Sequence, residues 1–290
     1  MKKVMVVGAG FMGAGIAQVC AQTGFTVYLM DVSEDALGKA LSGIKWSLEK
    51  FSAKGFLTNP PQTILERLTP VKDLRRAADV DWVIEAAFED QDLKEKIFRE
   101  LDDLAPADTP LATNTSSIPV SRLARVTHTP QRVLGLHFFG PVPFMGLVEV
   151  VKGEKTSEEI FKRGVEFVKT LGKTPVKVHK DIAGFVMNRI FGAAFRECVD
   201  LVAEGIASPE DIDIGMRLGY GWNIGPFEIA DNAGLDTFVR VGKTMQALGE
   251  NHLVAEPDLI LKMVEQGRLG RKVGHGFYRY GKDGKKIVES

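Results

Sequence analysis

The sequence predicts an α/β fold in two parts: an N-terminal domain built on a mostly parallel sheet, and a second, all-helical domain. A glycine-rich turn follows a short apolar run at the start of the chain, and strand-like runs then alternate with helical patterns to about Asp181. After Gly184 the patterns are all helical, with no convincing strand run. Such alternation is typical of parallel sheets that are covered by helices on both faces. We therefore expect domains over residues 1–184 and 185–290.

The first element is a strand, turn and helix around three glycines. Gly8, Gly10 and Gly13 follow an apolar run and open a helical stretch. A glycine turns the chain sharply at Gly8, lets the main chain approach a pyrophosphate at Gly10, and brings the helix close to the sheet at Gly13. The phosphates would bind at the helix N-terminus. The pattern predicts a Rossmann-type domain, with the cofactor-binding loop residues Gly8, Ala9, Gly10, Phe11, Met12 and Gly13.

Asp31 ends the next apolar run, about 20 positions after the glycines. A carboxylate there accepts hydrogen bonds from both ribose hydroxyls and repels a 2′-phosphate, so NAD is favoured over NADP. The alternative is that Asp31 serves the following helix. Ser33 is the better N-cap, because Glu34 and Asp35 then lie in the first turn, where the helix dipole favours anions.

Periodicity gives the remaining elements. The expected strands are Lys3 to Val7, Thr26 to Asp31, Trp82 to Ala87, Leu111 to Thr113, Val133 to His137, Leu147 to Val151 and Val176 to Val178. In the first domain we expect helices from the glycine turn to Gly24, from Ser33 to about Lys54, and from Leu93 to Leu104. In the second we expect Phe185 to Glu204, Pro209 to Leu218, Pro226 to Leu248 and Asp258 to Gln266. Its apolar faces predict packing on the first domain or on a second copy, and we expect a homodimer.

Composition narrows the classes of function. The chain has 290 residues, 44% of them hydrophobic, with 37 basic and 38 acidic side chains. Nucleic acid and anionic membranes usually require a broad basic field, so neither is an expected partner. No apolar run approaches the ~18 residues of a membrane span, and the opening run is too short for a signal peptide. The two cysteines, Cys20 and Cys198, lie in apolar helical patterns, which predicts buried reduced thiols and a cytoplasmic protein.

His137 and Glu149 carry the candidate chemistry. They lie in consecutive strand-like runs. A histidine exchanges a proton near neutral pH, and a carboxylate on its other ring nitrogen fixes the tautomer and stabilises the imidazolium. Such a pair suits alcohol oxidation, because a base must take the hydroxyl proton as hydride leaves for nicotinamide. Taken alone, a histidine at a strand end is more often a satisfied core residue.

Several ordered motifs carry a resemblance that covers almost the whole chain. They are GAGFMGAGIAQVCAQTGFTVYLMD, VIEAAFEDQDLKEKIF, NTSSIP, HFFGPVP followed by LVEVV, AGFVMNR and GRKVGHGFYRY. Together they resemble the L-3-hydroxyacyl-CoA dehydrogenase family, which includes the 3-hydroxybutyryl-CoA dehydrogenases. The resemblance implies a two-domain dimer that oxidises the 3-hydroxyl of an acyl-CoA thioester with NAD, reversibly.

The resemblance also implies catalytic roles. His137 matches the general base and Glu149 its partner, while Ser116 and Asn188 match polar residues beside the reacting oxygen of the substrate. Ser117 competes with Ser116 for this role. Each of the two polar residues has a structural alternative: Ser116 makes a turn before a proline, and Asn188 bonds the main chain at a helix start.

By the same resemblance, Glu89, Lys94 and Lys272 match cofactor-binding positions. The alternative for Glu89 and Lys94 is a solvated pair at a helix start. Ser47 and Lys54 match contacts to the acyl-CoA substrate, and a run of lysines offers cations to the CoA phosphates. The alternative is that these lysines, Lys45, Lys50 and Lys54, form the exposed face of an amphipathic helix. No metal site is expected.

Two positions depart from the family pattern. Gly140 stands where the family commonly has asparagine, and Gly146 where it often has lysine. The loss of an amide near His137 removes a donor and an acceptor, while the acid-base pair is retained. Two other functions stay open: oxidation of a free hydroxy acid or a carnitine-like alcohol, and a catalytically silent NAD-binding protein.

Overall fold

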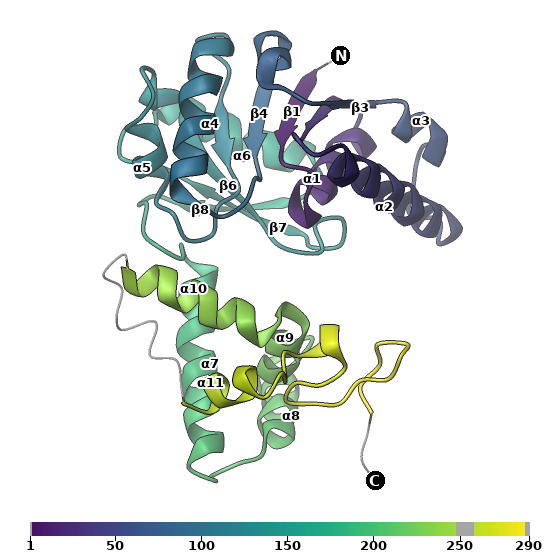
Figure 1. The fold of residues 1–290 in the computed structure, drawn as a ribbon, viewed down its shortest axis with the longest axis vertical. Helices are drawn as coiled ribbons and strands as arrows, with labels where there is room; N and C mark the ends of the chain where they lie inside the picture. Colours follow the sequence, from purple (N-terminus) through teal and green to yellow (C-terminus); the bar gives the residue numbers. More distant parts are fainter. Residues whose placement is uncertain (1, 248–257, 288–290) are drawn as a thin grey trace. The chain divides into compact units, whose positions relative to one another are not determined.

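The chain folds into two compact units, one ending at Phe185 and the other starting at Val186 (Figure 1). The computed structural model describes residues 2–247 and 258–287.

The first unit is built on one sheet of eight strands in the order β3-β2-β1-β4-β5-β6-β7-β8. The pairs from β3 to β6 are parallel, β7 is antiparallel to β6, and β8 is parallel to β7. The strands are β1 (Lys3–Val7), β2 (Thr26–Met30), β3 (Leu68–Val71), β4 (Trp82–Glu85), β5 (Leu111–Thr113), β6 (Val133–Phe138), β7 (Leu147–Val151) and β8 (Thr174–Val178). Every residue of β4 and β6 is buried, which requires cover on both faces of the sheet. The expected mostly parallel sheet is confirmed.

Helices follow most of these strands. They are α1 (Phe11–Gln22), α2 (Glu34–Ala53), α3 (Pro61–Leu65), α4 (Gln91–Leu104), α5 (Val120–Ala124) and α6 (Glu158–Thr170), with short 3-10 turns η1 (Leu74–Asp79) and η2 (Pro130–Arg132). Ser33 caps α2 as expected, because its hydroxyl accepts from Ala36 N. Asp90 caps α4 in the same way, so this helix begins two residues before the expected Leu93.

The sequence did not predict four elements of the first unit: α3, β3, α5 and α6. β3 has the sequence LTPV and pairs with β2 at the edge of the described sheet, where a strand tolerates proline. α6 contains Gly164, a residue that weakens a helical pattern. A Cβ at Gly164 would lie 2.5 Å from Leu134 Cδ1, so close packing on the sheet accounts for the glycine.

The second unit is helical, as expected. Its helices are α7 (Met187–Ala203), α8 (Pro209–Tyr220), α9 (Pro226–Ala233), α10 (Leu235–Ala247) and α11 (Asp258–Glu265), followed by the 3-10 turn η4 (Arg271–Val273). The expected single helix from Pro226 to Leu248 is wrong: Gly234, at φ 91°, separates α9 from α10. A positive φ of this size ends a helix and favours glycine. Leu248 itself lies outside the described residues.

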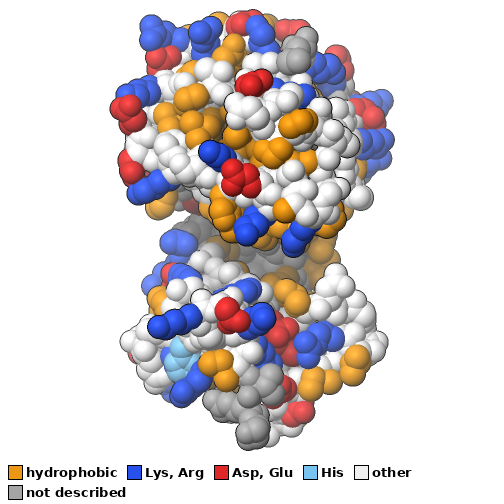
Figure 2. Space-filling view, turned by 90° about the vertical axis from the view of Figure 1, so that its right-hand side faces the viewer, with side chains coloured by type: hydrophobic (Ala, Val, Ile, Leu, Met, Phe, Trp, Pro, Cys, Tyr) orange, Lys and Arg blue, Asp and Glu red, His pale blue; other side chains and the backbone are white. Residues whose placement is uncertain are grey.

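Both cysteines are free and buried, as expected. Burial raises the pKa of the Cys20 thiol to about 12, so it remains protonated at neutral pH. In the part of the chain that the structure describes, no helix has the length and apolar character needed to cross a membrane. On the face drawn in Figure 2, acidic and basic side chains are interspersed over the first unit.

Candidate active site

The glycine turn between β1 and α1 leaves no room for side chains at two of its positions. Gly8 has φ 105°, and a Cβ there would lie 2.5 Å from Ala86 O. A Cβ at Gly13 would lie 1.8 Å from Gly8 O in the turn and 3.6 Å from Val6 Cγ1 in β1. The turn therefore excludes a side chain at Gly13 more strictly than the sheet does. Both positions therefore require glycine.

Gly10 is different, because the structure leaves the space beside it open. A Cβ there would meet no described atom within 4 Å, and no side chain caps the start of α1. Open space next to unpaired N–H groups at a helix N-terminus is what a pyrophosphate requires. The turn thus fits the diphosphate of a dinucleotide.

Asp31 holds the glycine turn and the start of α2 together. Its Oδ2 accepts from Ala9 N at 2.8 Å and its Oδ1 from Ser33 N at 2.9 Å. The bond to Ser33 means that the carboxylate also serves the following helix, which was the alternative interpretation. A carboxylate has about four lone-pair sites, so acceptor capacity remains for ribose hydroxyls.

Lys94 lies in the first turn of α4 and its buried ammonium group reaches Glu85, the last residue of β4. It is only 1% exposed, and its Nζ lies 2.6 Å from Glu85 Oε1 and 3.3 Å from Glu89 Oε2. A solvated pair is therefore the wrong interpretation of Glu89 and Lys94. Burial raises the pKa of Glu85, although Lys94 opposes the shift.

Glu89 organises the loop after β5. Its Oε1 accepts from the N–H groups of Ser116 and Ser117 at 3.1 and 3.2 Å, and from the Ser117 hydroxyl at 2.8 Å. Burial alone would raise the pKa of Glu89, but the charge of Lys94 and these hydrogen bonds outweigh it, and the pKa is lowered. Ser117 is buried and bonded to Glu89, whereas the half-buried Ser116 side chain makes no hydrogen bond to any described residue. Of the two serines, Ser116 has the available hydroxyl.

His137 and Glu149 face each other across the β6–β7 hairpin. They are direct partners in the antiparallel register, which places both side chains on one face of the sheet. His137 Nδ1 lies 2.7 Å from Glu149 Oε2, and the two residues are 6% and 0% exposed. Because Nδ1 is engaged, Nε2 is the ring nitrogen left for proton exchange with another group. The ring of Phe139 lies 4.6 Å from the imidazole, centroid to centroid, and that of Phe185 5.5 Å.

Two further residues support this edge of the sheet, and sequence reasoning missed both. Glu85 joins Lys94 to Thr113, whose hydroxyl donates to it at 2.7 Å. Asn114 Oδ1 accepts from Phe138 N at 2.9 Å, next to His137. An acid that ends a buried strand run was a usable signal for Glu85. No sequence signal pointed to Asn114, because its partner Phe138 comes close only through the pairing of β5 with β6.

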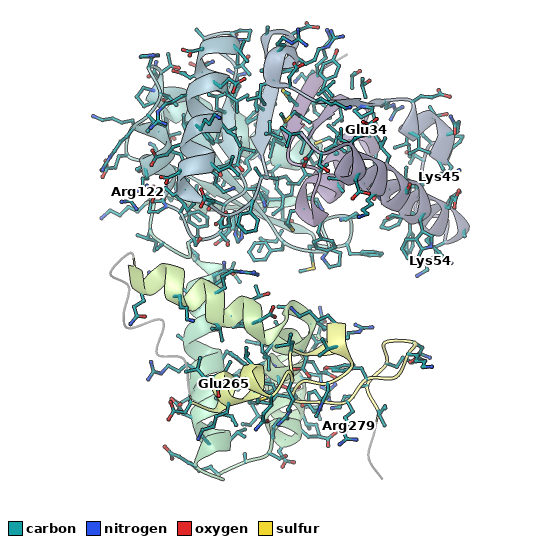
Figure 3. All side chains as sticks on the ribbon, in the orientation of Figure 1. Glu34, Lys45, Lys54, Arg122, Glu265 and Arg279 are labelled. Atoms are coloured by element: carbon teal, nitrogen blue, oxygen red, sulfur yellow. The ribbon has the colours of Figure 1, made fainter. Side chains whose placement is uncertain are left out.

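The remaining predicted residues lie elsewhere in the chain. In the second unit, Asn188 is the second residue of α7 and half-buried, and Lys272 Nζ binds both carboxylate oxygens of Asp236, at 2.5 and 2.6 Å. On α2, Ser47 is half-buried and Lys54 is the exposed C-cap. Figure 3 shows Lys45 and Lys54 on the outer part of α2.

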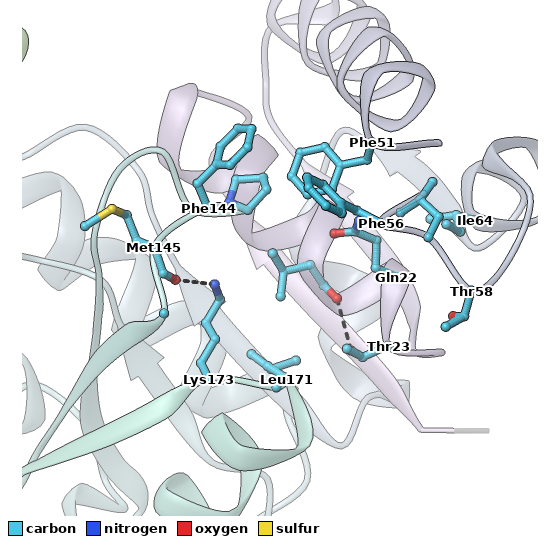
Figure 4. A pocket seen from close by; sticks show the side chains of 15 residues that line it. Gln22, Thr23, Phe51, Phe56, Thr58, Ile64, Phe144, Met145, Leu171 and Lys173 are labelled. Carbon is cyan, nitrogen blue, oxygen red and sulfur yellow. Dashed lines mark hydrogen bonds between the residues drawn. The ribbon is translucent and has the colours of Figure 1, made fainter. Parts of the chain in front are cut away.

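A cavity of about 330 Å³ lies beside the end of α2 (Figure 4). Its lining includes Phe51, Phe56 and Phe144, and excludes His137 and Glu149. The cavity is therefore separate from His137. Phe51, which lines the cavity, lies in the sequence between Ser47 and Lys54, the two residues matched to CoA contacts.

Comparison with known proteins identifies the family. The model described as "3-hydroxyacyl-CoA dehydrogenase, NAD binding domain" matches residues 3–182, and "3-hydroxyacyl-CoA dehydrogenase, C-terminal domain" matches residues 184–280. The chain belongs to the 3-hydroxyacyl-CoA dehydrogenase family. It is an NAD-dependent oxidoreductase, as the sequence motifs predicted.

Individual relatives agree with this assignment. The chain is 43% identical to a probable 3-hydroxybutyryl-CoA dehydrogenase of Deinococcus radiodurans, over 96% of this chain and 100% of that one. It is 44% identical to the mitochondrial hydroxyacyl-coenzyme A dehydrogenase of Mus musculus, over 97% and 91%. The crystal structure of (S)-3-hydroxybutyryl-CoA dehydrogenase from Ralstonia eutropha matches with a TM-score of 0.89 at 40% identity, covering 97% of this chain and 100% of that one.

Proposed function

We propose that the enzyme oxidises the 3-hydroxyl of an L-3-hydroxyacyl-CoA to the ketone, reversibly, with His137 as the acid-base group and Glu149 as its orienting carboxylate. The observation that carries this proposal is the 2.7 Å contact between His137 Nδ1 and the fully buried Glu149. When bound, NAD supplies the acceptor for the hydride that leaves the substrate carbon.

His137 moves the proton. Nε2 accepts it from the substrate hydroxyl during oxidation and returns it to the carbonyl oxygen during reduction. Glu149 accepts from Nδ1–H, which fixes the tautomer with Nε2 unprotonated and stabilises the imidazolium after proton transfer. Burial of the pair strengthens this interaction, because little water screens it.

Ser116 and Asn188 are the proposed hydrogen-bonding partners of the substrate oxygen. The commitment of Ser117 to Glu89 favours Ser116 for this task. Asn188 rests on the family motif and on its place in the first turn of α7. Hydrogen bonds at this oxygen follow its change between hydroxyl and carbonyl.

The cofactor residues are the glycine turn from Gly8 to Gly13, with Asp31 for the adenosine ribose. Glu89, Lys94 and Lys272 complete the proposed NAD site. Glu89 and Lys94 contribute by holding the loop that carries Ser116. Ser47 and Lys54 on α2 are the proposed CoA contacts.

The relatives named 3-hydroxybutyryl-CoA dehydrogenase favour a short acyl chain for the substrate. We also propose a cytoplasmic homodimer. Free, buried thiols suit a reducing compartment, and the second unit exposes large apolar side chains, among them Ile190, Ile206 and Leu218, that a second copy would cover.

The test follows NADH absorbance with acetoacetyl-CoA, with free acetoacetate and without substrate. The proposal expects rapid NADH loss with the thioester alone. Equal rates with free acetoacetate would assign a free-acid dehydrogenase, and loss with neither substrate a silent NAD-binding protein. His137→Gln should lower kcat about 1,000-fold, to a small residual rate, and leave NADH binding unchanged. Near-normal turnover in this variant would refute the assigned base.

A further inference from the structure

The loop that follows His137 packs on the cofactor-binding helix at two glycines. Residues 139–146 join β6 to β7. A Cβ at Gly15 in α1 would lie 2.8 Å from Val142 Cβ, and a Cβ at Gly140 would lie 2.8 Å from Phe11 Cε1. At Gly15 the contact is with the buried Val142, whereas at Gly140 it is with the exposed ring of Phe11, which must move if a side chain is added. The loop and α1 therefore approach each other closely because Gly15 and Gly140 have no side chains.

The loop is the rigid partner in these contacts. Lys173 Nζ donates to Val142 O at 2.7 Å and to Met145 O at 2.6 Å, and the second bond is drawn in Figure 4. Thr174 N donates to Gly146 O at 2.7 Å. Lys173 is itself buried, and its bond to Val142 O is shielded from water. The main chain of the loop resists displacement.

Phe11 is the mobile partner. It is the first residue of α1, directly after Gly10, and it is 71% exposed. An exposed side chain changes rotamer far more readily than a hydrogen-bonded main chain moves. A new side chain at Gly140 would therefore displace the Phe11 ring, and the open space nearby is beside Gly10.

We propose that Gly140 is a positioning residue for the cofactor. Because it has no side chain, the Phe11 ring rests against the loop after His137 and leaves the start of α1 clear for the NAD diphosphate. This inference rests on the proposed function only for the place of NAD at the glycine turn, and it is independent of the assigned base.

The chain offers a matched control within the same loop. A Cβ at Gly146 would meet no described atom within 4 Å. Neither Gly140 nor Gly146 is among the glycines with positive φ, so neither position requires glycine for a left-handed main chain. Gly140→Ala and Gly146→Ala therefore differ in the space that the new methyl group meets.

The experiment titrates the full-length protein with NADH, followed by fluorescence, in the wild type and in four variants. These are Gly140→Ala, Gly146→Ala, Phe11→Ala and the double variant Phe11→Ala/Gly140→Ala. We expect Gly140→Ala to weaken NADH binding about tenfold, because the displaced Phe11 ring competes with the diphosphate for space, and Gly146→Ala to change it less than about twofold. In the Phe11→Ala background, Gly140→Ala should add less than about twofold, because the ring is gone and the nearest remaining neighbour, Met12 Sδ at 3.4 Å, is in ordinary van der Waals contact.

Two outcomes would overturn the inference. One is NADH binding in Gly140→Ala equal to that of Gly146→Ala. The other is the same loss in the Phe11→Ala background, which would place the effect in the loop. If Gly140→Ala alone does not fold, the double variant compared with Phe11→Ala still decides. Acetoacetyl-CoA reduction by the wild type is measured separately. If the wild type does not reduce acetoacetyl-CoA, the proposed function is wrong, and the inference about Gly140 is unaffected.

Discussion

Two carboxylates of the first unit and two of the second have pKa values shifted in opposite directions. In the first unit, Glu89 faces Lys94, and Asp102 lies 2.7 Å from Arg132. Burial acts to raise the pKa of both carboxyls, but hydrogen bonds and the facing cations outweigh it, and both pKa values are lowered.

In the second unit, Asp213 and Asp231 accept hydrogen bonds from neutral donors. Asp213 binds Phe227 N at 2.8 Å and the Tyr278 hydroxyl at 2.8 Å, and Asp231 binds Tyr278 N and the Tyr280 hydroxyl, both at 3.0 Å. Burial raises the pKa of both aspartates. Together they tie the last turns of the chain to α8 and α9.

The two sets of carboxylates hold different parts of the molecule. In the first unit, Glu89 binds the main chain of Ser116 and Ser117, so changes at Glu89 or Lys94 should affect catalysis as well as stability. Asp102 and Arg132 join α4 to η2, so changes there should affect stability. The aspartates of the second unit fix a chain segment, so changes there should affect stability alone.

Lys94→Met should produce the largest effect. It leaves Glu85 buried without its cation, and loss of one partner of a buried pair costs about 3 to 5 kcal/mol. Urea unfolding measures this loss. The double variant Glu85→Gln/Lys94→Met should recover most of it. A loss below about 1 kcal/mol in the single variant would contradict the role of the charge pair.

Glu149→Gln should lower kcat about 100-fold and leave NADH binding unchanged. The amide retains the shape of the side chain but loses the charge that stabilises the imidazolium. Steady-state kinetics with acetoacetyl-CoA measures the effect, with urea unfolding as the control for folding. An unchanged kcat would remove Glu149 from the chemistry.

Tyr278→Phe should destabilise the second unit by about 1.5 to 3 kcal/mol, because a hydrogen bond to a charged group is lost. The kcat of the folded enzyme should stay the same. Tyr220→Phe is the matched control, since Tyr220 is exposed, and it should change neither quantity. A fall in kcat for Tyr278→Phe would break the separation of roles between the units.

The smallest effect is an opposite response to pH. Asp213 and Asp231 have raised pKa values when folded, so their contribution to stability is full below the unfolded pKa of about 4 and is lost as pH rises through the folded pKa. Glu89 and Asp102 have lowered pKa values, so their contribution is full above about 4 and is lost as pH falls further.

Hydrogen exchange can report the two sets separately. After correction for the intrinsic pH dependence of exchange, protection of the Phe227 and Tyr278 amides should not fall between pH 7 and about 4. Protection of the Ser116 and Ser117 amides, which bind Glu89, should fall below about 4. A parallel response of both pairs would contradict the comparison.

Local patterns predicted much of the fold. The apolar runs predicted the long strands, and Ser33 with its acidic neighbours predicted the start of α2. Periodicity failed where one residue decides, as at Gly234, whose φ of 91° splits an otherwise continuous helical pattern. It also failed at β3, a short edge strand that contains a proline.

The candidate site was predictable where motif and strand pairing agree. His137 and Glu149 lie in consecutive strands, and the hairpin register places them opposite each other. The links from Glu85 to Lys94 and from Asn114 to Phe138 depend on which loops meet at the sheet edge, and spacing along the chain carries no signal for that.

The most direct test of the acid-base pair compares kcat for His137→Gln with kcat for His137→Gln/Glu149→Gln. If Glu149 acts through the imidazole, the second substitution has nothing left to orient, and the two variants should agree within about threefold. A further loss of about 100-fold in the double variant, equal to that of Glu149→Gln alone, would show that the two residues act independently and would contradict the account.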